Sequence, residues 1–123
     1  MQDPRLRELA KVLVHHSTRL QKGEKILIEA FDVPARVVQC LIEEIVSVGA
    51  LPFVTLKNNQ VLRALYTYAT EAQMAEIGAI ERFRMEKMDA YIGIRGADIP
   101  DGPRFSVFQL PTIWKFSVNK ERN

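Results

Sequence analysis

The order of two short apolar runs, with a helical segment between them, constrains the fold of this chain most. The run EKILIEAF is rich in Ile and Leu and predicts a buried strand over Lys25–Ala30. A helical segment follows, with Asp32 and Pro34 at its start and Gly49 at its end. The run LPFVTLK then predicts a second strand over Phe53–Lys57. Short connections in this order indicate a right-handed βαβ unit with parallel strands.

The N-terminal segment has the features of an amphipathic helix. Asp3 and Pro4 fit an N-cap and a first helical residue, and Gly23 is a stop signal. The apolar stripe between them consists of Leu6, Leu9, Ala10, Leu13 and Leu20, with the small Ser17 in line. This spacing predicts one helix that covers a face of the sheet.

Three further elements are expected after the second strand. NQVLRALYTYA predicts a short helix, Thr70 and Gln73 form a capping box for a helix running to about Met88, and DAYIGIRG predicts a strand over Ala90–Arg95. The expected fold class is α/β, with a small, mostly parallel sheet of about three strands flanked by helices in a βαβ organisation. We expect residues 1–98 to form this domain. Residues 99–123 contain three prolines and no clean periodicity, so an irregular or divergent tail is expected there.

The last predicted helix carries apolar residues on more than one side. Met74, Ile77 and Met85 share a face with Glu81, whereas Phe83 lies opposite. This pattern fits either a loosely amphipathic helix or a helix covered by something that the sequence does not contain.

Composition and charge narrow the class of protein. The chain has 17 Lys and Arg residues and 15 Asp and Glu residues, a net charge of only +2, and the charges alternate in sign along the chain. This distribution is not typical of a nucleic-acid-binding protein. No apolar run approaches the roughly 18 residues of a transmembrane helix, and the charged N-terminus lacks the apolar core of a signal peptide. The single cysteine, Cys40, is expected to be a small packing residue. We therefore expect a cytoplasmic protein that binds neither nucleic acid nor membrane.

The two histidines, His15 and His16, are adjacent in the sequence. Adjacent helix residues face different directions, so one metal ion is not easily held by both, and we expect His15 to face water and His16 to lie at the edge of the stripe. The sequence has no phosphate-binding loop, no dinucleotide-binding glycine pattern and no nucleophile elbow. No catalytic, cofactor-binding or metal-binding residue is therefore assigned.

One positional argument points to a ligand site. In open parallel sheets, ligands bind beyond the carboxyl ends of the strands. Here those ends carry Asp32, Asn58, Asn59, Arg95 and Asp98, which are predicted to line a cleft. Ordinary loop polarity and helix capping is the alternative explanation of these residues.

Several segments, in order, resemble the start of the thermophilic aminopeptidase family of metal-dependent leucyl aminopeptidases. They are DPRLRELAKVLVHHSTRLQKGEKILIEAF, VGALPFVTL and ERFRMEKMDAYIGIRGAD, and together they cover about residues 1–98. The resemblance implies the N-terminal α/β domain of a two-domain cytoplasmic exopeptidase. Such enzymes remove N-terminal residues from peptides with two divalent metals, zinc or cobalt, and assemble as homodimers.

The resemblance also implies that the metal ligands, mostly Glu, His and Asp, belong to a C-terminal domain that this sequence lacks. We therefore expect a domain that is inactive alone and whose candidate partners are another copy of this chain and a full-length relative. After Asp98 the sequence departs from the family pattern, which suggests a truncated or shifted form or a natural short paralogue. Two alternatives remain: a stand-alone small-ligand-binding α/β module, and an interaction protein that pairs with a full-length relative.

Overall fold

The structure, a computed structural model, describes residues 4–96 and 112–115 of the 123-residue chain. Its helices are α1 (Pro4–Lys11), the π-helical segment η1 (Val12–Ser17), α2 (Ala35–Ser47), α3 (Asn59–Tyr68) and α4 (Glu71–Glu86). Its strands are β1 (Lys25–Phe31), β2 (Leu51–Lys57), β3 (Ala90–Arg95) and β4 (Thr112–Lys115).

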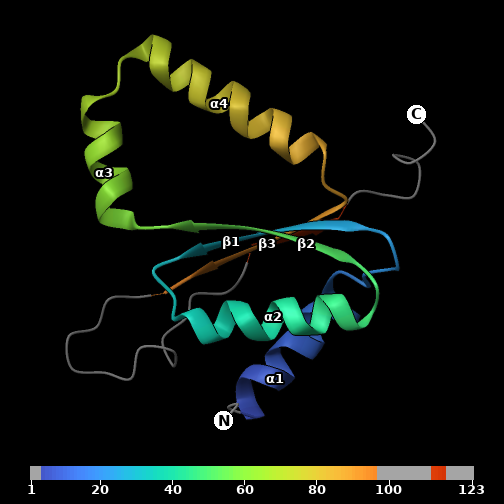
Figure 1. The fold of residues 1–123 in the computed structure, drawn as a ribbon. Helices are drawn as coiled ribbons and strands as arrows, with labels where there is room; N and C mark the ends of the chain where they lie inside the picture. The colour runs from blue at the N-terminus through green and yellow to red at the C-terminus, as the bar shows by residue number, and fades with distance from the viewer. Residues whose placement is uncertain (1–3, 97–111, 116–123) are drawn as a thin grey trace, which may run out of the picture.

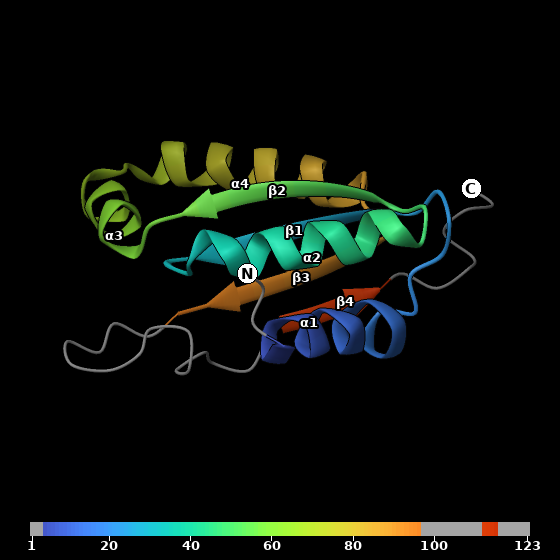
Figure 2. The same cartoon turned by 60° about the horizontal axis from the view of Figure 1, so that its bottom comes forward.

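These elements form three layers around one sheet (Figure 1). The strand order is β2-β1-β3-β4, in which β1 pairs in parallel with β2 and β3, and β4 pairs antiparallel with β3. One face of the sheet is covered by α1 and α2, and α3 and α4 lie on the other side (Figures 1 and 2). The predicted α/β class, with a small and mostly parallel sheet flanked by helices, is confirmed.

The βαβ unit is closed by a glycine at the end of α2. Gly49 has a φ of 81°, and its N–H donates to the carbonyl of Val46 at 2.9 Å. The N–H of Ala50 reaches back to the carbonyl of Ile45 at 3.2 Å. This pair of bonds is a Schellman motif, and it turns the chain directly into β2.

The main core lies between the sheet and the α1–α2 layer. Ile26 and Ile28 of β1 and Ile92 of β3 are fully buried there, beside Leu41 of α2. Cys40 belongs to the same buried cluster, as expected of a packing residue. Because burying one such side chain contributes about 2–3 kcal/mol, this face provides most of the apolar stabilisation of the domain.

The N-terminal helix differs from the sequence prediction in its last turns. It continues only as η1 to Ser17, and Arg19, at a φ of 45°, has left the helix well before Gly23. A π-helical turn is wider than an α-helical turn, so the buried stripe shifts. Val14 and Thr18 are buried, whereas Ser17, predicted to lie in the stripe, is exposed. The prediction of a single regular helix was therefore wrong here.

β4 lies in a segment for which the sequence predicts no element. It pairs with β3 so that Trp114 stacks on Tyr91, with 5.7 Å between the ring centroids. Apart from β4, the tail predicted over residues 99–123 lies outside the described residues. The division into a domain and a tail stays a prediction.

The second helical layer packs loosely on the sheet. Neither α3 nor α4 contains a buried residue. The large exposed apolar side chains of this layer are Val61, Leu65, Tyr66, Tyr68, Met74, Ile80 and Phe83. Only the C-terminal end of α4 contributes to a small apolar cluster, through Met85 against Leu27, Met88 and Tyr91. No helix within the described ranges is long and apolar enough to cross a membrane.

Candidate functional site

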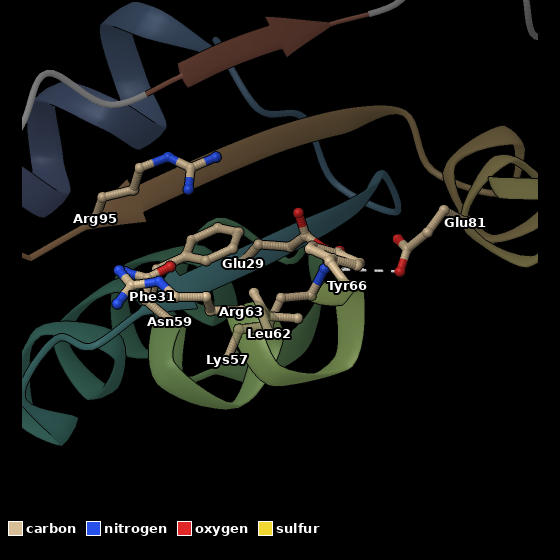
Figure 3. A pocket seen from close by; sticks show the side chains of 9 residues that line it. All are labelled: Glu29, Phe31, Lys57, Asn59, Leu62, Arg63, Tyr66, Glu81 and Arg95. Carbon is tan, nitrogen blue, oxygen red and sulfur yellow. Dashed lines mark ion pairs between the residues drawn. The ribbon is translucent and has the colours of Figure 1, made fainter. Parts of the chain in front are cut away.

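A cavity of about 580 Å³ opens at the carboxyl ends of the parallel strands, beside α3 (Figure 3). The strands contribute Glu29, Phe31, Lys57 and Arg95 to its lining. The helices contribute Asn59, Leu62, Arg63, Tyr66 and Glu81. The cavity lies here because β1, β2 and β3 run in parallel and therefore end at the same edge of the sheet.

Glu29 is the buried centre of the polar lining. It lies in β1 on the face that looks toward α4, and only 7% of the residue is exposed. Its Oε1 accepts a hydrogen bond from the Tyr91 hydroxyl at 2.7 Å. Its Oε2 lies 3.1 Å from Lys57 Nζ and 3.3 Å from Arg84 Nη2. These partners are needed because an unpaired buried carboxylate is strongly unfavourable.

The charge network extends from Glu29 to α4. Arg84 donates through Nη1 to Thr55 Oγ1 at 2.8 Å and through Nη2 to Glu81 Oε2 at 2.9 Å. Glu81 also lies 3.6 Å from Lys57 Nζ, the pair drawn as a dashed line in Figure 3. Two carboxylates and two cations thus connect α4 to β1 and β2. Since α4 contains no buried side chain, this network is a principal contact between the helix and the sheet.

The aromatic ring of Phe31 contacts two of the cationic residues that line the cavity, Arg95 and Lys57. The guanidinium carbon of Arg95 lies 4.0 Å from the centroid of the Phe31 ring, and Lys57 Nζ lies 5.5 Å from it. Arg95 comes from β3, across the cavity from the residues of α3 (Figure 3). Stacking on the ring holds the guanidinium in place by a cation–π interaction.

Four of the five predicted cleft residues lie in the described part of the chain, and the structure divides them between two roles. Asn59 and Arg95 line the cavity. Asp32 accepts a hydrogen bond from the backbone N–H of Asn59 through Oδ2 at 3.1 Å, and Asn58 caps α3 by accepting one through Oδ1 at 3.0 Å. These two residues therefore shape the backbone at the edge of the cavity. Asp98 lies outside the described residues.

Sequence reasoning missed the charged centre of the cavity. Glu29 is the one acidic residue within a strand predicted to be buried, and such a charge must find partners. Glu81, placed among apolar residues on its helix, carries the same signal. Lys57, Arg63 and Tyr66 carry no such signal, because their proximity depends on strand register and on the path of α3.

The two histidines do not assemble a metal site. His15 and His16 are exposed, and His15 Nε2 lies 2.6 Å from Glu44 Oε2 on α2. Within residues 4–96 and 112–115, no group of three or more His, Cys, Asp or Glu side chains is placed to hold a metal ion. The described residues thus do not fit the divalent metals that the family resemblance implies.

Tyr91 gives the site a testable pH dependence. Burial, and then the hydrogen bond to Glu29, raise the pKa of Tyr91 above its ordinary value. Above about pH 10 the unfolded chain releases a phenol proton that the folded chain keeps, so the free energy of unfolding falls as pH rises, by up to about 1.4 kcal/mol per unit. Urea unfolding between about pH 9 and 11 should show this slope reduced in Tyr91→Phe and unchanged in Tyr68→Phe, which removes an exposed phenol. Equal slopes in all three proteins would contradict the assignment.

The fold and the cavity define a βαβ-type α/β domain whose candidate site lies at the carboxyl ends of its parallel strands. The sequence model of the thermophilic metalloprotease family (M29) matches residues 2–102, so the chain belongs to that family. The resemblance in the sequence is thereby confirmed. The match takes in α1 to α4, β1 to β3 and every residue that lines the cavity.

Wild-type AmpT from Thermus thermophilus is among the solved structures that are similar to this chain. The similarity has a TM-score of 0.47 and 25% sequence identity over 55% of this chain. The matched region is 17% of the AmpT chain, so this chain spans a small part of that protein. No curated protein matches this sequence.

Proposed function

We propose that residues 4–96 belong to a metal-dependent aminopeptidase, as a part that does not supply the metal ligands. The observation that carries this proposal is the family match over residues 2–102. Removal of N-terminal residues from peptides then requires zinc or cobalt ligands from outside these residues. The part described here is inactive alone and contributes a scaffold and a wall of the substrate cleft.

The positions of the potential ligands support this division of roles. Glu29 and Glu81 are neutralised by the cations Lys57 and Arg84, and so are poor ligands for an added divalent ion. His15 is engaged by Glu44 in the α1–α2 layer, on the other face of the sheet. A cytoplasmic location and a homodimeric assembly belong to the same proposal and rest on the family resemblance.

Metal content of the purified chain tests where the ligands lie. After incubation with Zn²⁺ or Co²⁺ and dialysis, elemental analysis should find far less than one metal ion per chain. His15→Ala should leave this background unchanged, because the pair with Glu44 offers only two ligands. One chelator-removable ion per chain would contradict the proposal.

A second candidate function is pairing with another copy or with a full-length relative. The specific observation in its favour is the exposed apolar surface of α3 and α4, where Ile80 is 65% and Phe83 is 63% exposed. Apolar side chains grouped on loosely packed helices are typical of a surface that binds a partner. The exposure of α4 also fits the expectation of a helix covered by something else.

Replacing Phe83 by Asp should weaken this pairing. In sedimentation experiments over a range of concentrations, Phe83→Asp should raise the dissociation constant about tenfold or more, because a buried Phe contributes about 2–3 kcal/mol. Val46→Asp is the matched control, since Val46 is 56% exposed on α2 in the other layer and should leave association unchanged. A monomer at every concentration, or equal effects of both changes, would exclude pairing through α4.

A further inference from the structure

The cavity has a surplus of positive charge once its ion pairs are matched. Its two lining carboxylates, Glu29 and Glu81, are both engaged by Lys57, and both are also engaged by Arg84. These four charges cancel one another. Arg63 and Arg95 line the same cavity and are not part of that balance.

Within the part of the chain that the structure describes, no carboxylate lies in ion-pair contact with Arg63 or Arg95. Both side chains are on exposed residues, so the guanidinium groups can reach a molecule in the cavity. A guanidinium group stays protonated at any ordinary pH and presents its N–H donors as a planar fork that matches carboxylate and phosphate oxygens. Arg95 is also held over Phe31 at 4.0 Å, which lowers the entropy it loses when it binds.

The rest of the lining suits a small organic molecule. Leu62 and Phe31 supply apolar surface, and Asn59 and Tyr66 supply a side-chain amide and a hydroxyl. A volume of about 580 Å³ lies within the range of small-molecule sites. The cavity also occupies the carboxyl ends of parallel strands, where open α/β sheets bind their ligands.

We propose that this cavity is a binding site for a small organic anion whose carboxylate or phosphate group is held between Arg63 and Arg95. The apolar part of the ligand lies against Leu62 and Phe31. Lys57 and Arg84 are occupied with the two carboxylates and serve to keep the negative charges of the cavity neutral. This binding requires no metal, and it goes beyond the proposed peptidase role.

Three probes that share one aromatic ring test the proposal on the whole chain. Phenylacetate carries a carboxylate, phenyl phosphate carries a phosphate, and phenylacetamide is uncharged. In NMR titrations of protein freed of metal beforehand, at least one of the two anions should bind saturably, and the amide should bind at least about tenfold more weakly. The anion that binds more tightly identifies the group for which the site is built. Added NaCl should weaken anion binding and leave any binding of the amide unaffected.

Arginine variants place the binding in this cavity. Arg63→Gln and Arg95→Gln should each weaken binding of the preferred anion about tenfold. Arg82→Gln is the matched control, because Arg82 is exposed on α4 and does not line the cavity. Arg63 lies on the exposed surface of α3, so its replacement keeps the test informative even if Arg95→Gln disturbs the packing on Phe31.

Three results would overturn the proposal: no saturable binding of either anion, binding of the amide as tight as that of the anions, or an equal loss of binding in Arg82→Gln. Because these titrations contain no metal and measure no turnover, their failure leaves the peptidase proposal untouched. In turn, if the peptidase proposal fails, the expected results of these anion titrations do not change.

Discussion

Glu29→Gln should lower the free energy of unfolding by about 2–3 kcal/mol. Removing one member of a fully buried ion pair costs about 3–5 kcal/mol, and the cost is smaller here because the side chains of Lys57 and Arg84 are 18% and 34% exposed. The amide keeps the size of the side chain and can still accept the hydrogen bond from Tyr91. The decrease in the free energy of unfolding is therefore due to the removal of the negative charge, and urea unfolding measures it.

The same variant should loosen α4 before the rest of the domain. α4 contains no buried residue, and Arg84 connects it to Glu29 and to Thr55 of the sheet. Amide hydrogen exchange should therefore accelerate more in α4 than in α2, whose core residues are buried. Glu76→Gln, at an exposed position of α4, should change stability by less than about 0.5 kcal/mol. An effect of Glu29→Gln no larger than that of this control would show that the network does not hold the helix.

Gly96→Ala should destabilise the domain by about 1–3 kcal/mol and disturb the edge of the cavity. A Cβ at Gly96 would lie 2.4 Å from the backbone carbonyl oxygen of Asp32, so the backbone itself has to move. Asp32 is already held at a φ of 57° and accepts the hydrogen bond from Asn59. A shift there moves the start of α3, and with it Asn59 at the cavity wall.

Gly78→Ala is the matched control for that substitution. Gly78 lies within α4, and a Cβ there meets no atom within 4 Å. Ala is a better helix former than Gly by about 1 kcal/mol, so this variant should be slightly more stable than the parent. Thermal unfolding should show a lower midpoint temperature for Gly96→Ala and a slightly higher one for Gly78→Ala. Equal shifts of the midpoint would contradict the close approach at Gly96.

The elements that were predicted well are those encoded by local pattern. The strand over Ala90–Arg95 matches β3 at both ends, and Gly49 ends α2 as expected. The Thr70 hydroxyl accepts from the Gln73 N–H at 3.1 Å, which is one half of the predicted capping box. In each case the signal consists of neighbouring residues, so the sequence alone carries it.

The features that were missed depend on residues far apart in the chain. β4 is a strand because it pairs with β3, and the four residues TIWK show no hydrophobic pattern that would predict this pairing. The shifted stripe of η1 follows from burial of Val14 and Thr18 against the core, which overrides regular helical spacing. Glu29 and Arg84 are 55 positions apart in the sequence. The sequence therefore indicates that a buried Glu29 needs a cationic partner, but it does not indicate which residue that partner is. The location of the cavity at the strand ends was predicted from the sequence, whereas most of the residues that line it were not.

Hydrolysis of leucyl-p-nitroanilide by the purified 123-residue chain, with and without added Co²⁺ or Zn²⁺, tests the central claim most directly. The proposal that this chain is a part of a metallo-aminopeptidase, and does not supply the metal ligands, predicts no metal-dependent turnover. Turnover that survives repurification and disappears with a chelator would contradict it, because a working metal site would then lie within this chain.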